Sequence, residues 1–166
     1  MIVAVDDDHG IGKTNDMAWR NKDDMAFFRK TTMQSSDQNT LPNLLIMGRN
    51  TWNSIGKALP GRMSMVITRD KTLTIADPNV VVVHSVDDAI HWVQKNVDRI
   101  HIPFVIGGGQ IYTQFLARPG LIKTLYVTTI PGTHQCDVFF PTELPPTTGC
   151  ETLDFRSLNI LKFEFQ

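Results

Sequence analysis

The sequence is poor in cysteine, with only Cys136 and Cys150 among its 166 residues. Two cysteines are too few for the disulfide framework of a small secreted protein. The first residues, Met1-Ile2-Val3-Ala4-Val5, lack the basic region and cleavage site of a signal peptide. No apolar run approaches the length of a membrane span. We therefore expect a reducing, cytoplasmic setting and no membrane partner.

The sequence also lacks an excess of charge of one sign. Its formal net charge is −1, with both signs interspersed, so no electrostatic footprint for nucleic acid is present. His134 and Cys136 alone make no metal site, and the run Asp6-Asp7-Asp8 lacks the glycine and terminal glutamate of a calcium loop. No Ser or Cys stands in a nucleophile motif. We expect neither a metal ion nor a nucleic-acid partner.

What the chain does have is the apolar content of a folded domain. Hydrophobic residues make up 42% of the sequence, enough for a real core in one domain over residues 1–166, which we expect to be monomeric. Short apolar runs predict strands at 2–5, 44–47, 63–68, 80–83 and 104–106, and helical patterns begin near residues 21, 49, 85 and 109. Alternating segments 123–130 and 158–165 predict two more strands, with a long surface loop between them. The fold class is therefore α/β, with a mainly parallel central sheet, flanking helices and a C-terminal antiparallel hairpin.

A glycine-rich junction at residues 107–109 joins one predicted strand to a helix that begins with Gln110-Ile111-Tyr112. Free amides and the dipole of such a helix start favour a phosphate, and glycines let it approach the backbone. Tyr112 stands where the last glycine of the G-x-G-x-x-G fingerprint would be, so the motif is not that fingerprint. The alternative is a glycine-rich connection without a ligand.

A second strand–glycine–helix junction lies at Gly48, followed by the cation Arg49 and the hydroxyl of Thr51. Both side chains suit a phosphate, so two such junctions suggest a ligand with more than one phosphate. At the end of the strand 63–68, Arg69 is a further phosphate candidate, whereas Asp70 would suit a bare ribose hydroxyl.

The segment after residue 20 predicts a helix in which Asn21 is the cap and Asp24 lies three residues further on. We expect the helix to bury Met25, Phe28 and Thr32, which puts the Asp24 carboxylate at the edge of an apolar stripe. Such a carboxylate is a candidate for ligand binding or proton chemistry. Spacing alone favours the alternative, a capping acid.

Two loops complete the pattern. The segment 10–16 follows a strand and has the glycines, Asn and Asp of an irregular loop, so it is a candidate lid. Arg62, near the apolar Leu59, is able to hold a carboxylate in a fork, although a surface arginine is the commoner case. We assign no chemistry to the polar segment 31–42.

Together these blocks resemble the dihydrofolate reductase family. They occur in the family's order, cover most of the chain and are jointly specific. The blocks are Ile2-Val3-Ala4-Val5, Gly10-Ile11-Gly12, Asp16-Met17-Ala18-Trp19, Asp24-Met25-Ala26-Phe27-Phe28, Ile46-Met47-Gly48-Arg49-Asn50-Thr51-Trp52, Ile55-Gly56, Leu59-Pro60-Gly61-Arg62 and Ile106-Gly107-Gly108-Gly109.

The resemblance implies NADPH-dependent reduction of 7,8-dihydrofolate to 5,6,7,8-tetrahydrofolate, with a hydride to pterin C6 and a proton to N5. Such a reaction supports one-carbon metabolism and thymidylate and purine synthesis, and the site would also bind antifolate inhibitors. Asp24 matches the family's acid in the pterin pocket, and Thr128 matches the threonine that supports it. Asp23 competes for the acid's role, but that register would put the charged Asp24 at a buried apolar position.

Further positions follow from the same resemblance. The substrate-binding positions other than Asp24 and Thr128 are Ile2, Met25, Phe28, Ile55, Lys57, Leu59, Arg62 and Ile106, of which Arg62 would grip the α-carboxylate of the folate's glutamate. The cofactor positions are Ala4, Ile11, Gly48, Arg49, Asn50, Thr51, Thr68, Arg69, His84, Gly107, Gly108, Gly109, Gln110, Ile111 and Tyr112. Arg49 and Arg69 would favour the 2′-phosphate of NADPH over NADH. The lid would run from Gly10 through Met17 to Trp19.

The chain departs from the family pattern at Ala18, where the family usually has proline before the tryptophan, and in a longer loop at 33–43. Two alternatives stay open. One is a pyrimidine reductase of riboflavin synthesis with the same fold, which need not keep Trp19, Asp24, Phe28 and Arg62 together. The other is a nucleotide-binding protein without turnover.

Overall fold

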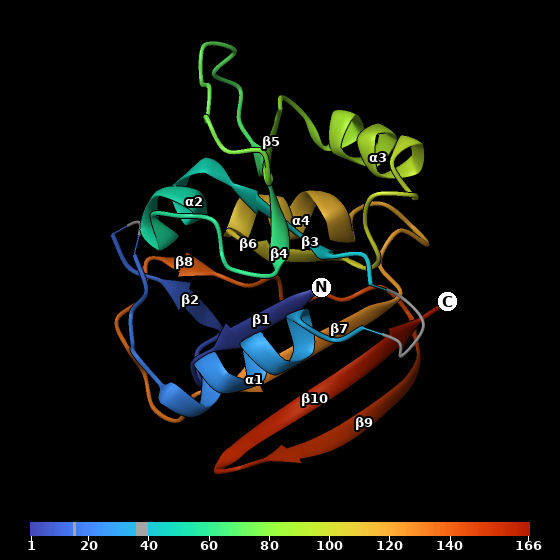
Figure 1. Ribbon diagram of the computed structural model, residues 1–166. Coiled ribbons are helices and arrows are strands. Elements are labelled where there is room, and N and C mark those ends of the chain that lie inside the picture. The colour runs from blue at the N-terminus through green and yellow to red at the C-terminus, as the bar shows by residue number, and fades with distance from the viewer. Residues whose placement is uncertain (15, 36–39) are drawn as a thin grey trace.

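Two four-stranded sheets form the centre of the protein, as the computed structural model in Figure 1 shows. The structure describes residues 1–14, 16–35 and 40–166. The first sheet is parallel throughout and has the order β5 (Val80–Val83), β4 (Arg62–Ile67), β3 (Asn43–Gly48), β6 (Pro103–Gly107). The second has the order β1 (Ile2–Val5), β7 (Thr124–Thr129), β10 (Leu158–Phe165), β9 (Thr147–Phe155). Strand β1 lies against β6, so the two sheets meet at the centre.

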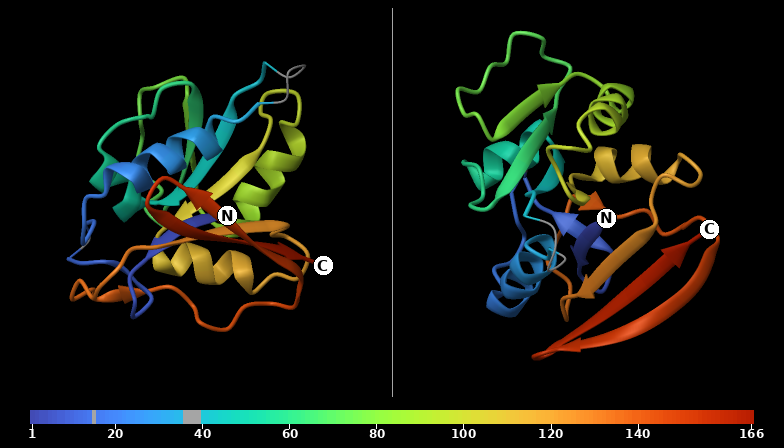
Figure 2. Two further views of the ribbon diagram at one scale, coloured as in Figure 1. Left: turned by 90° about the horizontal axis from the view of Figure 1, so that it is seen from below. Right: turned by 45° about the vertical axis from the view of Figure 1, so that its right-hand side comes forward.

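Four helices pack on this layer in the described part of the chain: α1 (Lys22–Thr32), α2 (Arg49–Ile55), α3 (Val86–Lys95) and α4 (Gly109–Leu116). The buried strand β3 separates two apolar clusters because its side chains alternate between its faces. Leu44 and Ile46 pack with α3 and α4, whereas Leu45 and Met47 pack with α1 and α2. The two helix pairs therefore cover opposite faces (Figure 2).

Local sequence explains where the helices begin and end. The Asn21 side chain accepts hydrogen bonds from the amides of Asp23 and Asp24, both at 3.0 Å, and the Ser85 hydroxyl caps α3 in the same way. Helix α2 ends at Gly56, whose φ of 80° is left-handed and suits glycine.

The predicted α/β class, parallel sheet and C-terminal hairpin are confirmed, and the segments 123–130 and 158–165 pair in antiparallel fashion, as predicted, as β7 and β10. The prediction that these two strands are consecutive is wrong. The hairpin consists of β9 and β10, and β7 pairs with the other edge of β10 and, in parallel, with β1. Strand β9 falls in the predicted surface loop because it is exposed along most of its length and alternates only at its end, at Leu153 and Phe155. The same loop also contains β8 (Val138–Phe139), which pairs with β2 (Gly10–Gly12).

Candidate functional site

The first turn of α1 sends two neighbouring carboxylates in different directions. The Asp23 carboxylate accepts hydrogen bonds from Ser157 Oγ at 2.7 Å and from the Arg156 guanidinium at 3.1 Å, at the turn between β9 and β10. These two bonds hold the pKa of Asp23 below its usual value. Asp23 therefore anchors the helix to the hairpin.

The Asp24 side chain faces inward, and its carboxylate has no hydrogen-bond or ion-pair partner among the described residues. Burial raises the pKa of this carboxyl to about 6. Burial also raises the pKa of the Tyr112 phenol, and the nearby charge of Asp24 adds to that effect. The Tyr112 hydroxyl lies 2.8 Å from the carbonyl oxygen of Ile2 and 2.7 Å from that of Ile106. Asp24 thus belongs to the region between α1, β1 and the end of β6.

Four buried side-chain atoms lack hydrogen-bond partners in the described structure: Trp19 Nε1, Ser64 Oγ, Thr128 Oγ1 and His134 Nδ1. Thr128, on β7 opposite Ala4, is 1% exposed, and its hydroxyl makes no hydrogen bond. The indole Nε1 of Trp19 is also buried and unpaired. An unpaired buried donor or acceptor costs about 1–3 kcal/mol. A bound polar molecule that reaches these atoms would remove that cost.

Most of the predicted pocket walls gather in one apolar cluster. Its members include Ile2, Ala4, Phe28, Ile55, Leu59 and Ile106, together with Trp19 and Trp52. Met25 is an exception: the prediction that α1 buries it is wrong, because it is 57% exposed. The buried residues of α1 are Phe27, at 6% exposure, Thr31 and Thr32. Phe27 occupies the core position, so the apolar stripe is rotated away from Met25.

Arg62 is buried at the other end of α1, not on the surface. The side chain is 7% exposed, and its guanidinium donates to Thr32 Oγ1 at 3.0 Å and to the Pro60 carbonyl at 3.2 Å. Burial lowers the pKa of Arg62, and the nearby charge of Arg29 adds to the effect. No carboxylate pairs with Arg62 among the residues that the structure describes. Lys57 is exposed in the same segment, between α2 and β4.

The two strand–glycine–helix junctions, predicted separately, lie side by side. A Cβ atom built on Gly107 or Gly108 would lie 3.4 or 3.5 Å from the Thr51 hydroxyl, and one on Gly48 would lie 3.9 Å from the Gly108 amide nitrogen. The Gly107–Gly108 peptide bond is cis. Glycine is also needed at position 109, since a Cβ atom there would come within 2.8 Å of Val138. The two junctions therefore adjoin each other.

The charged side chains near the end of β4 differ from the prediction in one respect. Arg49 and Asp70 were expected to act separately, but they form an ion pair at 2.8 Å. Hydrogen bonds from Thr72, with a smaller contribution from Arg49, keep the pKa of Asp70 below its usual value. Arg69 is exposed and has no side-chain partner in the described part of the chain. His84 Nδ1 lies 2.9 Å from the carbonyl oxygen of Thr68, which fixes the imidazole against the end of β4.

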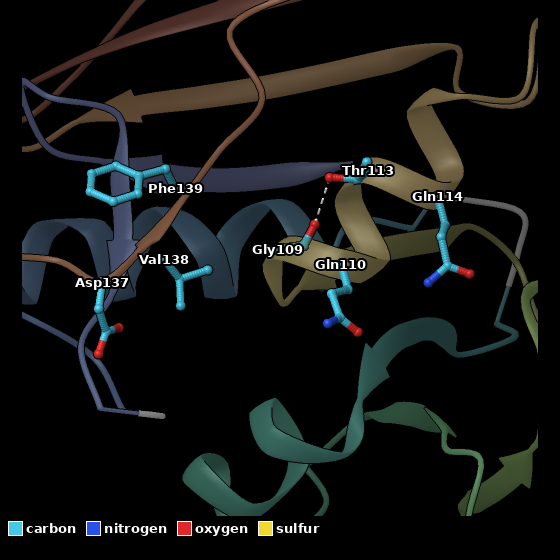
Figure 3. A pocket seen from close by; sticks show the side chains of 7 residues that line it. All are labelled: Gly109, Gln110, Thr113, Gln114, Asp137, Val138 and Phe139. Atoms are coloured by element: carbon cyan, nitrogen blue, oxygen red, sulfur yellow. Dashed lines mark hydrogen bonds between the residues drawn. The ribbon is translucent and has the colours of Figure 1, made fainter.

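A pocket opens at the start of α4, between the helix and the β8 segment (Figure 3). It is lined by Gly109, Gln110, Thr113, Gln114, Asp137, Val138 and Phe139. The first two are predicted cofactor positions, but the sequence reasoning missed residues 137–139. They lie in a segment that was predicted to be a surface loop, and their pairing partner, β2, is more than a hundred residues away in the chain.

The predicted lid, Gly10 to Trp19, touches both sides of the site, although Asn15 lies outside the described residues. The Thr14 amide donates to the Asp137 carboxylate at 2.8 Å, and the Ser54 hydroxyl on α2 donates to Asp16 at 3.0 Å. Ile11 packs into the apolar cluster on the α4 side, whereas Met17 is 53% exposed. The segment therefore bridges the β8 segment and α2.

Two other features are absent from the residues that the structure describes. No three His, Cys, Asp or Glu side chains gather there in a way that would hold a metal ion. None of the described helices has the length and apolarity needed to cross a bilayer.

Comparison with known proteins identifies the family to which the chain belongs. The family model described as "Dihydrofolate reductase" matches residues 1–147. A dihydrofolate reductase of Staphylococcus haemolyticus is 35% identical over 141 residues, covering 85% of this chain and 75% of that protein. A bifunctional dihydrofolate reductase-thymidylate synthase of Daucus carota is 39% identical over 147 residues. The match covers 85% of this chain but only 28% of that relative, so this chain spans about a quarter of the bifunctional protein's length.

Proposed function

Because this chain belongs to the dihydrofolate reductase family, we propose that it reduces 7,8-dihydrofolate to 5,6,7,8-tetrahydrofolate with NADPH. The observation that carries the proposal is the Asp24 carboxylate, half-buried beside an apolar cluster, without a partner among the described residues and with its pKa raised to about 6. A group of this kind is suited to binding a polar ring and to proton transfer near neutral pH.

Asp24 on α1 and Arg62 on β4 each lack an oppositely charged partner among the described residues, and this supports a folate as the substrate. Asp24 accepts two charge-assisted hydrogen bonds from the guanidine-like edge of the pterin. Arg62, which donates to Thr32, binds the α-carboxylate of the glutamate. Asp24 and Thr32 are eight positions apart in the helix, about 12 Å along the axis, so the acid and the cation bind opposite ends of an elongated ligand.

The raised pKa of Asp24 is relevant to the protonation of pterin N5. A carboxyl with a pKa of about 6 is partly protonated near neutrality, whereas an ordinary aspartic acid is almost fully ionised there. Asp24 therefore promotes N5 protonation, and the unpaired hydroxyl of Thr128 supports the bound ring. Ile2, Phe28, Ile55, Leu59 and Ile106 pack around the pterin and keep water away from it.

The residues at the glycine junctions fit NADPH. The Thr51 hydroxyl lies beside Gly107 and Gly108, and the start of α4 offers free amides, which suits the diphosphate. Gly107 has a φ of 135°, which favours glycine at this position. Arg69 is free to bind the 2′-phosphate, while the charge of Arg49 is already balanced by Asp70. When bound, NADPH supplies the hydride that reaches C6. The lid from Gly10 to Trp19 excludes water from this step.

The proposal is tested by following NADPH absorbance with purified protein, with and without dihydrofolate, and with a pterin-type antifolate as inhibitor. We expect oxidation that requires dihydrofolate and stops with the antifolate. Asp24→Asn should bind NADPH but react far more slowly at neutral pH, whereas Asp98→Asn, at an exposed position, should react like the parent protein. An Asp24→Asn variant with unimpaired turnover would refute the role of this acid.

The same assay separates the two alternatives. The pyrimidine reductase is disfavoured because Trp19, Asp24, Phe28 and Arg62 all lie along one apolar cluster and the helix that borders it. Oxidation of NADPH by a ribosylated pyrimidine and not by dihydrofolate would nevertheless establish it. Binding of NADPH without any oxidation would favour a protein without turnover.

Three further expectations stay predictions: one domain over residues 1–166, a monomeric state and a reducing, cytoplasmic setting.

A further inference from the structure

A buried carboxylate outside the proposed pocket joins the lid to the loop that faces it. Asp6 follows β1 directly and is 3% exposed. Its Oδ1 accepts hydrogen bonds from the amides of Asp8 at 3.0 Å and Gly10 at 2.8 Å, and its Oδ2 accepts one from the amide of His134 at 2.9 Å. One side chain therefore satisfies the turn at which the lid begins and also the segment between β7 and β8.

The start of the lid and the segment between β7 and β8 are closely packed at this point. A Cβ atom on Gly10 would come within 2.5 Å of the Cys136 side chain. The Cys136 thiol lies 3.6 Å from Asp6 Oδ2. Burial alone would raise the pKa of Asp6, but the hydrogen bonds from His134, Gly10 and Asp8 outweigh it and hold that pKa below its usual value. Asp6 is therefore an ionised acceptor at neutral pH.

The facing loop in turn contacts the far end of the lid. The His134 imidazole packs edge-on against the Trp19 indole, with ring centroids 5.1 Å apart, and its Nδ1 lies 3.7 Å from Asp6 Oδ2. Trp19 packs into the apolar cluster that also contains Phe28, and its Nε1 is buried without a partner in the described structure. Asp6, His134 and Trp19 thus form a continuous chain of contacts that ends at the proposed pterin pocket.

We propose that Asp6 is a positioning residue: its carboxylate fixes the start of the lid to the facing loop and, through His134, sets the ring of Trp19 over the pocket. The expected change in reaction rate rests on the proposed function. The expected change in the position of Trp19 does not, because it is independent of turnover. It also gives His134 a role that requires no metal ion.

Asp6→Asn tests the chain of contacts without a change of size. A side-chain amide has only one acceptor oxygen, so it is able to satisfy the Asp8 and Gly10 amides or the His134 amide, but not both sets. Asp8→Asn is the matched control, since Asp8 is exposed and only its backbone amide is bound to Asp6.

The first readout is the indole N–H resonance of Trp19, assigned with Trp19→Phe in nitrogen-15 spectra of the protein without substrate. We expect Asp6→Asn to shift or broaden this resonance and to leave those of Trp52 and Trp92 in place, and we expect Asp8→Asn to change none of them. An unchanged Trp19 resonance in folded Asp6→Asn would overturn the proposal, whether or not the protein oxidises NADPH.

The second readout is the single-turnover rate of NADPH oxidation with saturating dihydrofolate, well below the melting temperature of each variant. We expect Asp6→Asn to lower this rate about tenfold with little change in the KM for dihydrofolate, because a misplaced Trp19 affects closure more than ground-state binding. A carboxylate that served only to cap a turn would lower the melting temperature and leave the rate of the folded enzyme unchanged, and that result would refute positioning.

A pair of variants at His134 keeps the test open if Asp6→Asn fails to fold. His134→Ala removes the ring that touches Trp19, so it should reproduce both effects. His134→Phe keeps an aromatic edge against the indole and should restore the resonance and most of the rate. Equal behaviour of the Ala and Phe variants would contradict the proposed route through the ring.

Discussion

We expect Asp24→Asn to make the protein more stable as well as to slow the proposed reaction. Burial raises the pKa of this carboxyl from 3.8 to about 6, so at neutral pH the folded state holds a charge that it disfavours. At about 1.36 kcal/mol per pKa unit, the shift corresponds to about 3 kcal/mol. The folded state binds the Asp24 proton more tightly than the unfolded state does. The free energy of unfolding therefore falls as the pH rises from the unfolded pKa to the folded pKa, and it stays at the lower value above that range.

The neutral amide of Asn does not carry this cost. We expect urea unfolding to show a gain of about 3 kcal/mol for Asp24→Asn at about pH 8, but less than about 1 kcal/mol at about pH 4, where the folded carboxyl is already protonated. Asp98→Asn, at an exposed position, serves as the control. A gain that is independent of pH, or a loss of stability at about pH 8, would refute the reasoning.

Three further predictions concern ligand binding. Arg62→Gln should weaken folate binding about 10- to 100-fold, because a charged hydrogen-bond partner is lost, but should hardly affect a pterin without glutamate; binding titrations compare the two. Arg69→Gln should raise the KM for NADPH about tenfold and leave the KM for NADH unchanged, and Arg49→Gln should have a smaller effect. If steady-state kinetics showed that Arg69→Gln raises both KM values equally, the assignment of Arg69 to the 2′-phosphate would be contradicted. Ser54→Ala removes the lid's bond to Asp16 at 3.0 Å and should speed product release several-fold in stopped-flow experiments, whereas slower release would argue against a latch.

The sequence predicted the parts of the fold that depend on short-range patterns. The apolar run 44–47 has a strand on both sides and a helix pair on each face, so its hydrophobicity alone identifies it. Asn21 and Ser85 cap the helices that they were expected to begin. Strand β9 was missed because its apolar alternation is confined to its end, and β8 was missed because its pairing with β2 is a long-range event.

The candidate site was predictable where a residue type matches a known role, and not where contacts decide. The glycine junctions and Asp24 were found from spacing and family resemblance, but no pattern shows that Arg49 pairs with Asp70. Met25 was misplaced because the helical stripe allows two rotations, and only packing of Phe27 against Tyr126 and Phe155 selects one. Asp6 was weighed only as part of a metal-binding run, since its amide partners lie in another loop.

The different surroundings of Asp23 and Asp24 give these two neighbouring carboxyl groups different protonation states. Hydrogen bonds lower the pKa of one carboxyl while burial raises that of its neighbour, so over the mildly acidic range the first is a carboxylate and the second an acid. Two chemically identical side chains, adjacent in the chain, therefore differ in pKa because their surroundings differ. The bonds from Ser157 and Arg156 to Asp23 hold the first turn of α1 in the orientation that leaves Asp24 beside the apolar cluster. The hairpin therefore helps to determine which of the two neighbouring aspartates has the raised pKa.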